Sequence, residues 1–292
     1  MLPILLYYIA LPFIYLIALL PFRIMYIISY GIFFVLYRLI GYRKKVVFEN
    51  LQRSFPEKTK EEIEKIAIAF YQHLCDMMLE TFKTLVISPK EMLLRCRISE
   101  NAQTLFNQYN DKQQSIILAM GHHGNWEWGG NSFSLACAQQ LHVIYHPLSN
   151  PQFDKLMINM RTRFGTKLIP MNDTFKAMVK NRKEVTATAF IADQSPSPTN
   201  AHWTNFLQQD TPFFLGMERI GGKMNYPIVY IFIKKIKRGY YELEATTLIE
   251  NPKDLSEGII TETYVRQLEK DIRQHPETWL WSHRRWKHKR SK

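Results

Sequence analysis

The chain has 292 residues and a formal net charge of +12, with 38 Lys and Arg against 26 Asp and Glu. This length fits one large domain or two modest ones. The excess of basic residues indicates a polyanion or an anionic surface as a partner. Three cysteines, Cys75, Cys96 and Cys137, lie far apart without paired spacing, which argues against a disulfide framework or a zinc knuckle.

The first stretch of the chain, residues 1–20, contains no charged side chain and is about as long as one bilayer crossing. A second apolar, aromatic-rich stretch covers residues 24–42. It fits either a second crossing or a helix lying in the membrane interface, and we favour a single anchor followed by an interfacial helix. A buried helical hairpin in a soluble protein is the alternative. In the interfacial interpretation, the side chains at headgroup depth are Tyr26, Tyr30 and Tyr37.

A basic cluster, Arg43, Lys44 and Lys45, follows these stretches directly. The positive-inside rule therefore predicts that the rest of the chain lies in the cytoplasm. We expect a membrane anchor and interfacial helix over residues 1–45, and one α/β domain over residues 46–292.

The segment Ser115–Gly130, SIILAMGHHGNWEWGG, concentrates the polar groups that suit chemistry. Its apolar beginning is typical of a strand buried on both faces of a parallel sheet. Gly124 and Asn125 then predict a turn, followed by a helix from Trp126. His122 is thereby expected at the carboxyl end of a strand, where open α/β sheets place their sites.

Five positions separate His122 from Glu127, which on one continuous helix would point them about 140° apart, at about 100° per residue. A helical zinc site is disfavoured, and we expect no metal. Across a strand–turn–helix corner, the glutamate can instead orient the imidazole as a general base that deprotonates a bound hydroxyl. The alternative is a helix-capping histidine beside a first-turn carboxylate.

Strand and helix patterns alternate after this segment, with strands expected near 141–145, 167–169 and 185–191. Such alternation predicts a mostly parallel sheet with helices on its faces. A hairpin is expected from 226–233 and 240–248, so the α/β sheet is mixed. We also expect Thr211-Pro212 to open a helix, with Phe206 and its neighbours forming either core or the wall of an acyl-chain pocket.

Several blocks in this order resemble the lauroyl/myristoyl acyltransferase family of lipid A biosynthesis, within the lysophospholipid-acyltransferase-like superfamily. The central block, Gly121 to Glu127, is similar to the family's His-x4-Glu (HX4E) motif. The other matching blocks are NLQRSFPE at 50–57, RTRFG at 161–165, Asp193-Gln194, and WLWSHRRWK at 279–287. The resemblance implies a glycerol-phosphate-acyltransferase-like fold with an N-terminal membrane-anchoring helix.

It further implies an inner-membrane transferase, facing the cytoplasm, that moves a fatty acyl chain from acyl-carrier protein to a hydroxyl of a lipid A precursor without a cofactor. The hypothesis makes His122 the general base and Glu127 the residue that fixes its tautomer. Backbone N–H groups near Gly124 and Asn125 are the expected donors to the thioester oxyanion.

By the same resemblance, the expected substrate-binding residues are Arg161 and Arg163, for a phosphorylated acceptor, and Asp193. Guanidinium is the side chain best shaped for phosphate. The residues themselves also allow a simpler interpretation, in which the arginines satisfy helix-terminal carbonyls. Aspartate at this position also suits an ordinary turn.

The C-terminal run interleaves Trp279, Trp281 and Trp286 with basic residues. This pattern suits single-stranded nucleic acid or a membrane interface, and we favour an anionic phospholipid membrane over nucleic acid because the N-terminus is already lipid-like. Two alternatives stay open for the function: acylation of another lipid or pigment acceptor, such as a lysophospholipid, an amino-acid lipid or an aryl polyene, and a catalytically inactive, membrane-tethered basic binding protein.

Overall fold

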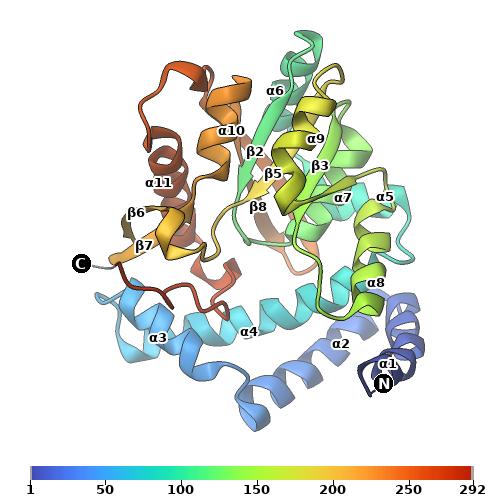
Figure 1. Cartoon of the computed structure of the whole chain (residues 1–292). Helices are drawn as coiled ribbons and strands as arrows, with labels where there is room; N and C mark the ends of the chain where they lie inside the picture. The colour runs from blue at the N-terminus through green and yellow to red at the C-terminus, as the bar shows by residue number, and fades with distance from the viewer. Residues whose placement is uncertain (1, 291–292) are drawn as a thin grey trace.

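The computed structural model describes residues 2–290, and the side chains from residue 7 onward. A seven-stranded sheet in the order β1-β9-β8-β2-β5-β3-β4 forms its centre (Figure 1). Among the described residues, all neighbouring strands run parallel except β8 and β9, so the prediction of a mixed, mostly parallel sheet is confirmed. The strands are β1 (Cys96–Ile98), β2 (Ile116–Met120), β3 (Gln140–Tyr145), β4 (Lys167–Pro170), β5 (Thr186–Ile191), β8 (Ile228–Lys237) and β9 (Tyr240–Ile249).

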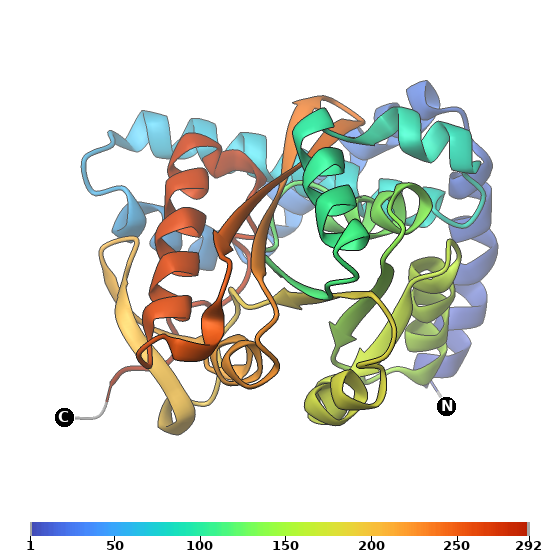
Figure 2. The same ribbon diagram turned by 90° about the horizontal axis from the view of Figure 1, so that it is seen from above.

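Helices cover both faces of this sheet (Figure 2). Alternate residues of β2 point to opposite sides, so Ile117 packs in one core cluster and Leu118 in the other. Helices α4, α10 and α11 contribute to the first cluster, and α5, α6 and α7 to the second. The helices are α3 (Lys44–Ser54), α4 (Lys60–Lys83), α5 (Pro89–Arg95), α6 (Glu100–Asp111), α7 (Trp126–Ala136), α8 (Pro151–Thr162), α9 (Thr174–Lys180), α10 (Gly216–Met224) and α11 (Ile259–Gln274).

A separate two-stranded hairpin stands where a helix was expected. Strands β6 (Ala201–Phe206) and β7 (Gln209–Phe214) pair antiparallel, so the prediction of a helix opening at Thr211-Pro212 is wrong. Leu207 and Gln208 both have positive φ, as a tight hairpin turn requires. Phe206 and Phe213 are buried in the core, which decides between the two interpretations of this aromatic surface.

The N-terminal segment folds as α1 (Leu2–Leu19), α2 (Phe22–Phe33) and a π-helical continuation, η1 (Phe34–Ile40). Among the described residues, one helix, Phe22–Ile40, is long and apolar enough to cross a membrane, with a mean hydropathy of 1.5. The described side chains of α1 give a shorter apolar helix, Tyr7–Leu19. The expected anchor at 1–20 lies partly outside the described side chains.

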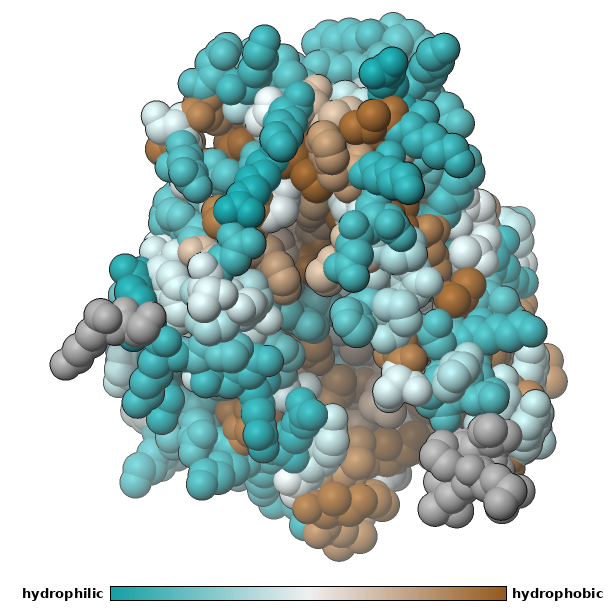
Figure 3. Space-filling model, in the orientation of Figure 1, coloured by the Kyte–Doolittle hydropathy of each residue, from teal (hydrophilic) through white to brown (hydrophobic). Residues whose placement is uncertain are grey.

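One side of α2 and η1 packs along α4. Ser29 Oγ donates to Asp76 Oδ1 at 2.6 Å, and Tyr26 Oη donates to Glu80 Oε1 at 2.8 Å. Because Tyr26 and the buried Tyr37 face the domain, the placement of these tyrosines at headgroup depth is wrong for both, and only Tyr30 is exposed, at 53%. The opposite side of this helix is apolar and open at the lower edge of Figure 3; its exposed residues include Ile24, Ile27, Phe34, Val35, Leu39 and Ile40.

Candidate active site

The polar turn after β2 depends on two glycines. A Cβ on Gly121 would lie 2.7 Å from Leu268 Cδ1, so any larger residue would force the Leu268 side chain of α11 to shift. Gly124 has a φ of +62°, and a Cβ there would lie 2.0 Å from the carbonyl oxygen of Ile233. Asn125 then caps α7, since its Oδ1 accepts from the backbone N–H of Trp128 at 3.0 Å. The predicted strand–turn–helix corner is therefore present.

His122 is held by Asp193, the second residue after β5. Its Nδ1 lies 2.6 Å from Asp193 Oδ1, and its backbone N–H donates to Oδ2 at 2.7 Å. Strand pairing explains this contact: Met120 is opposite Ile191 in parallel register, so the residues two positions later meet beyond the sheet. With Nδ1 donating to the carboxylate, Nε2 is left as the acceptor, and it lies 3.3 Å from Gln194 Nε2.

The carboxylate of Asp193 is buried but ionised. Burial alone would raise its pKa, but the charge of His122 and the hydrogen bonds from His122 and Trp279 outweigh burial and lower the pKa to about 2. Trp279 Nε1 donates to Asp193 Oδ2 at 2.8 Å.

Sequence reasoning placed Trp279 and Trp281 at a membrane interface, and this is wrong because both indoles are buried. Nothing in the local sequence signalled that Trp279 contacts the site.

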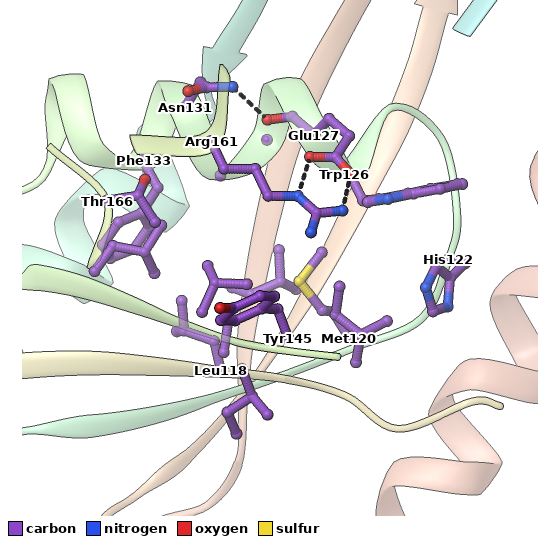
Figure 4. Close-up of a pocket in the computed structure, with 18 of the residues that line it drawn as sticks. Leu118, Met120, His122, Trp126, Glu127, Asn131, Phe133, Tyr145, Arg161 and Thr166 are labelled. Carbon is purple, nitrogen blue, oxygen red and sulfur yellow. Dashed lines mark hydrogen bonds and ion pairs between the residues drawn. The ribbon is translucent and has the colours of Figure 1, made fainter. Parts of the chain in front are cut away.

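Glu127 does not contact His122; it pairs with Arg161 of α8 instead (Figure 4). The guanidinium donates from Nε at 2.9 Å and from Nη2 at 2.6 Å to the two carboxylate oxygens. The expected Glu127–His122 contact is therefore corrected to two separate pairs. Glu127 lies in the first turn of α7 and its side chain points toward Arg161 of α8. His122 precedes this helix, and its ring points toward Asp193, just after β5.

The other expected site residues have structural partners. The N–H of Gly124 donates to the carbonyl of Thr278 at 3.0 Å, so it is not available to an oxyanion. Arg163 donates to the carbonyls of Thr84 and Ile87 just after α4, which matches the carbonyl-satisfying interpretation rather than a phosphate contact. His123 is also buried, and Thr278 Oγ1 lies 3.0 Å from its Nδ1.

A buried carboxylate beneath the turn was missed from the sequence. Glu80 Oε2 accepts from Asn125 Nδ2 and from Tyr241 Oη, both at 2.8 Å, while Oε1 accepts from Tyr26. Burial raises the pKa of Glu80, and the hydrogen bonds from Tyr241, Tyr26 and Asn125 act in the opposite direction. Glu80 thus links α2, α4, α7 and β9 at the turn that carries His122.

An apolar cavity of about 250 Å³ opens beside these two pairs. His122, Trp126, Glu127 and Arg161 lie at one part of its lining (Figure 4). The remainder is largely hydrocarbon and extends between α7 and the sheet; it includes Leu118, Met120, Phe133, Leu141, Ile233 and Leu243. A base next to a narrow apolar cavity suits a reaction on a substrate with a long hydrocarbon chain. Among the described residues, no group of three His, Cys, Asp or Glu side chains is placed to hold a metal ion.

The amino-acid sequence is similar to those of known proteins. The family model described as bacterial lipid A biosynthesis acyltransferase matches residues 1–288. The lipid A biosynthesis lauroyltransferase of Escherichia coli K12 is 22% identical over 282 residues, covering 94% of this chain and 88% of that protein.

Two further relatives match a shorter part of the chain. The lipid A biosynthesis myristoyltransferase of Escherichia coli K12 and the lipid A biosynthesis acyltransferase 1 of Shigella flexneri are each 21% identical over 159 residues. Each match covers 54% of this chain and spans about half of the relative, 48% of its length. Because the family model covers nearly all of the sequence, the chain belongs to the bacterial lipid A biosynthesis acyltransferase family.

Proposed function

We propose that this protein transfers a fatty acyl chain from acyl-carrier protein to a hydroxyl of a lipid A precursor, in a late step of lipid A biosynthesis. The observation that carries the proposal is the position of His122, whose Nδ1 is bound by Asp193 and whose side chain lines the apolar cavity. Family membership supports the acyl transfer, and the cavity supports a fatty acyl donor.

In the proposed step, Nε2 of His122 removes the proton from the acceptor hydroxyl, and the oxygen attacks the thioester carbonyl. The tetrahedral intermediate expels the carrier thiolate, which takes the proton back from the imidazolium. Asp193 keeps the imidazole in the tautomer with Nδ1 protonated and stabilises the imidazolium that forms. The result is an ester and a free thiol, with no cofactor consumed.

We assign the Glu127–Arg161 pair to stabilising the negative charge that develops on the thioester oxygen. Arg161 lines the same cavity as His122. Its Nε and Nη2 donate to the Glu127 carboxylate. Burial lowers the pKa of Arg161, but the adjacent Glu127 carboxylate more than offsets this, so the guanidinium stays charged. A fixed cation at the cavity mouth stabilises the oxyanion without reorganising during the reaction.

We further propose that the protein binds the inner membrane through its N-terminal helices, with residues 46–292 on the cytoplasmic side. The apolar side of Phe22–Ile40 is exposed, and the basic cluster Arg43, Lys44 and Lys45 follows it. The net charge of +12 suits anionic phospholipid, a phosphorylated acceptor and an acidic carrier protein.

The test is mass spectrometry of lipid A from cells that lack the gene and are complemented with wild type, His122→Ala or the matched control His288→Ala. We expect one acyl chain to disappear on deletion and to return with wild type and His288→Ala but not with His122→Ala. Unchanged lipid A in the deletion strain would contradict the proposed acceptor. Restoration by His122→Ala would contradict the proposed base.

A further inference from the structure

A second cavity, of about 450 Å³, shares no lining residue with the first. It is enclosed by η1, by the middle of α4 and by the C-terminal segment 280–283. Its walls are mainly apolar; Leu36, Leu74, Met78 and Leu280 supply them. We call it the lateral groove.

The lateral groove is lined on one side by the N-terminal helices and on another by a residue that is hydrogen-bonded to the His122 turn. Leu36 belongs to η1, whose neighbours Leu39 and Ile40 are exposed on the outer side of the same helix. At the other end, the backbone N–H of Leu280 donates to the carbonyl of His122 at 3.1 Å. The groove thus lies between the exposed apolar side of η1 and a C-terminal segment that is hydrogen-bonded to the His122 turn.

Polar groups are confined to one part of the lateral groove. Arg43 is fixed there, since its Nη1 donates to the carbonyl of Ser282 at 3.0 Å. His283 also lines the groove, and among the described residues its buried Nδ1 has no hydrogen-bond partner. Burial lowers the pKa of His283 to about 4, so the ring is neutral at physiological pH and its Nδ1 can donate or accept. A buried polar atom without a partner is unusual and indicates a missing ligand or water.

We propose that the lateral groove binds one hydrocarbon chain of the membrane-borne acceptor lipid, which enters sideways from the bilayer past η1. Arg43, at the start of the basic cluster that ends with Lys45, faces the anionic head group, and His283 hydrogen-bonds a polar atom near the head of that chain. The acyl donor then occupies the separate cavity beside Arg161. The identification of the lipid as the acceptor rests on the proposed function.

The test uses a substitution that fills the lateral groove without reaching the core. Met78 is 41% exposed on α4, so Met78→Trp is expected to place its indole in the groove while the chain folds. The matched control is Leu94→Trp on α5, where the side chain is 60% exposed and lines neither cavity. Equal melting temperatures of the two variants verify that both are folded.

The full-length protein is bound to phosphatidylglycerol vesicles that carry a lipid A precursor with a photoreactive diazirine on one acyl chain. After irradiation, peptide mapping should place the label on segments 74–78 and 280–283 in wild type and in Leu94→Trp. Labelling of these segments should fall at least about tenfold in Met78→Trp, the change that a loss of about 1.4 kcal/mol of binding produces. Equal labelling of Met78→Trp, or labels found only on other segments, would overturn the proposal.

Kinetics separate this inference from the proposed function. Met78→Trp should raise the KM for the acceptor about tenfold, whereas the control Leu94→Trp, which lines neither cavity, should leave it unchanged. Acyl transfer with an unaltered acceptor KM in Met78→Trp would refute the lateral groove alone. Labelling of the groove in a wild-type protein that does not acylate the precursor would instead refute the proposed function and retain a lipid-binding groove.

Discussion

Asp193 binds His122 through both of its carboxylate oxygens, one on the imidazole Nδ1 and one on the backbone N–H. The side chain and the main chain of the proposed base are thus fixed by one buried group that lies two residues beyond the neighbouring parallel strand, β5. This arrangement predicts which carboxylate controls the histidine.

Asp193→Asn should lower kcat by roughly 10²- to 10⁴-fold with little change in KM, because an amide can stabilise the wrong imidazole tautomer. Trp279→Phe removes one donor to the same carboxylate and should cost about tenfold, near the 1–3 kcal/mol of a lost charged hydrogen bond. The measurement is the pH profile of kcat/KM for both variants. A full rate in Asp193→Asn would show that another residue orients His122.

Glu127 and Arg161 should behave as a unit in a double-mutant cycle. Glu127→Gln and Arg161→Lys each break the two-point contact, since lysine cannot reproduce the planar fork of arginine. We expect each single variant to lower kcat and the double variant to be little worse, with a coupling free energy of about 1–3 kcal/mol. Additive losses would contradict a shared role for this pair.

Gly124→Ala tests whether the turn that follows His122 requires glycine at its position of positive φ. The added Cβ would sit 2.0 Å from the carbonyl oxygen of Ile233 at a φ of +62°, so we expect a loss of folding stability on the order of 3 kcal/mol or more. Gly222→Ala in α10 is the control, because its Cβ would meet only an ordinary contact at 3.8 Å and should stabilise the helix by about 0.5–1 kcal/mol. Thermal denaturation in detergent compares the two.

The cavity lined by His122 and Arg161, where we place the acyl donor, should limit the length of the acyl chain. Gly130 lines it, and a Cβ at this position would meet only Leu141, at 3.9 Å. Gly130→Met should therefore extend into the cavity and favour shorter acyl donors, by about fourfold per methylene excluded, since each buried methylene contributes about 0.8 kcal/mol. Competition between acyl thioesters of different length measures this ratio. An unchanged preference would place the acyl chain outside this cavity.

Buried histidines predict acid sensitivity of the fold. Burial and the nearby His275 lower the pKa of His123 to about 3, well below its ordinary value of 6.5. The unfolded chain therefore binds a proton that the folded chain does not, so stability is lost as the pH falls from about 6.5 toward 3.

Each such histidine contributes a slope of at most about 1.4 kcal/mol per pH unit within that window. Chemical denaturation at pH 7.5 and pH 5, for wild type and His123→Asn, measures the slope. We expect a smaller pH dependence in the variant; an equal dependence would assign the effect to other groups, such as His283.

The sequence by itself determined most of the elements of the central sheet, although not the β6–β7 hairpin. The apolar run of β2, the glycine-flanked turn and the order of the strand and helix patterns predicted a mostly parallel sheet with His122 at its carboxyl edge, and the structure confirms that sheet. These features are local, since strand burial, turn glycines and helix starts depend on near neighbours in the chain.

Only the tertiary structure decided the partners. Glu127 lies five residues after His122, and this separation leaves the direction of its side chain open. The order and register of β2 and β5 bring Asp193 to His122, and α8 brings Arg161 to Glu127. The same holds for Trp279, an amphipathic side chain that fits a membrane interface or a buried hydrogen bond equally well. Contacts between residues tens of positions apart depend on how the elements pack, and no local pattern encodes them.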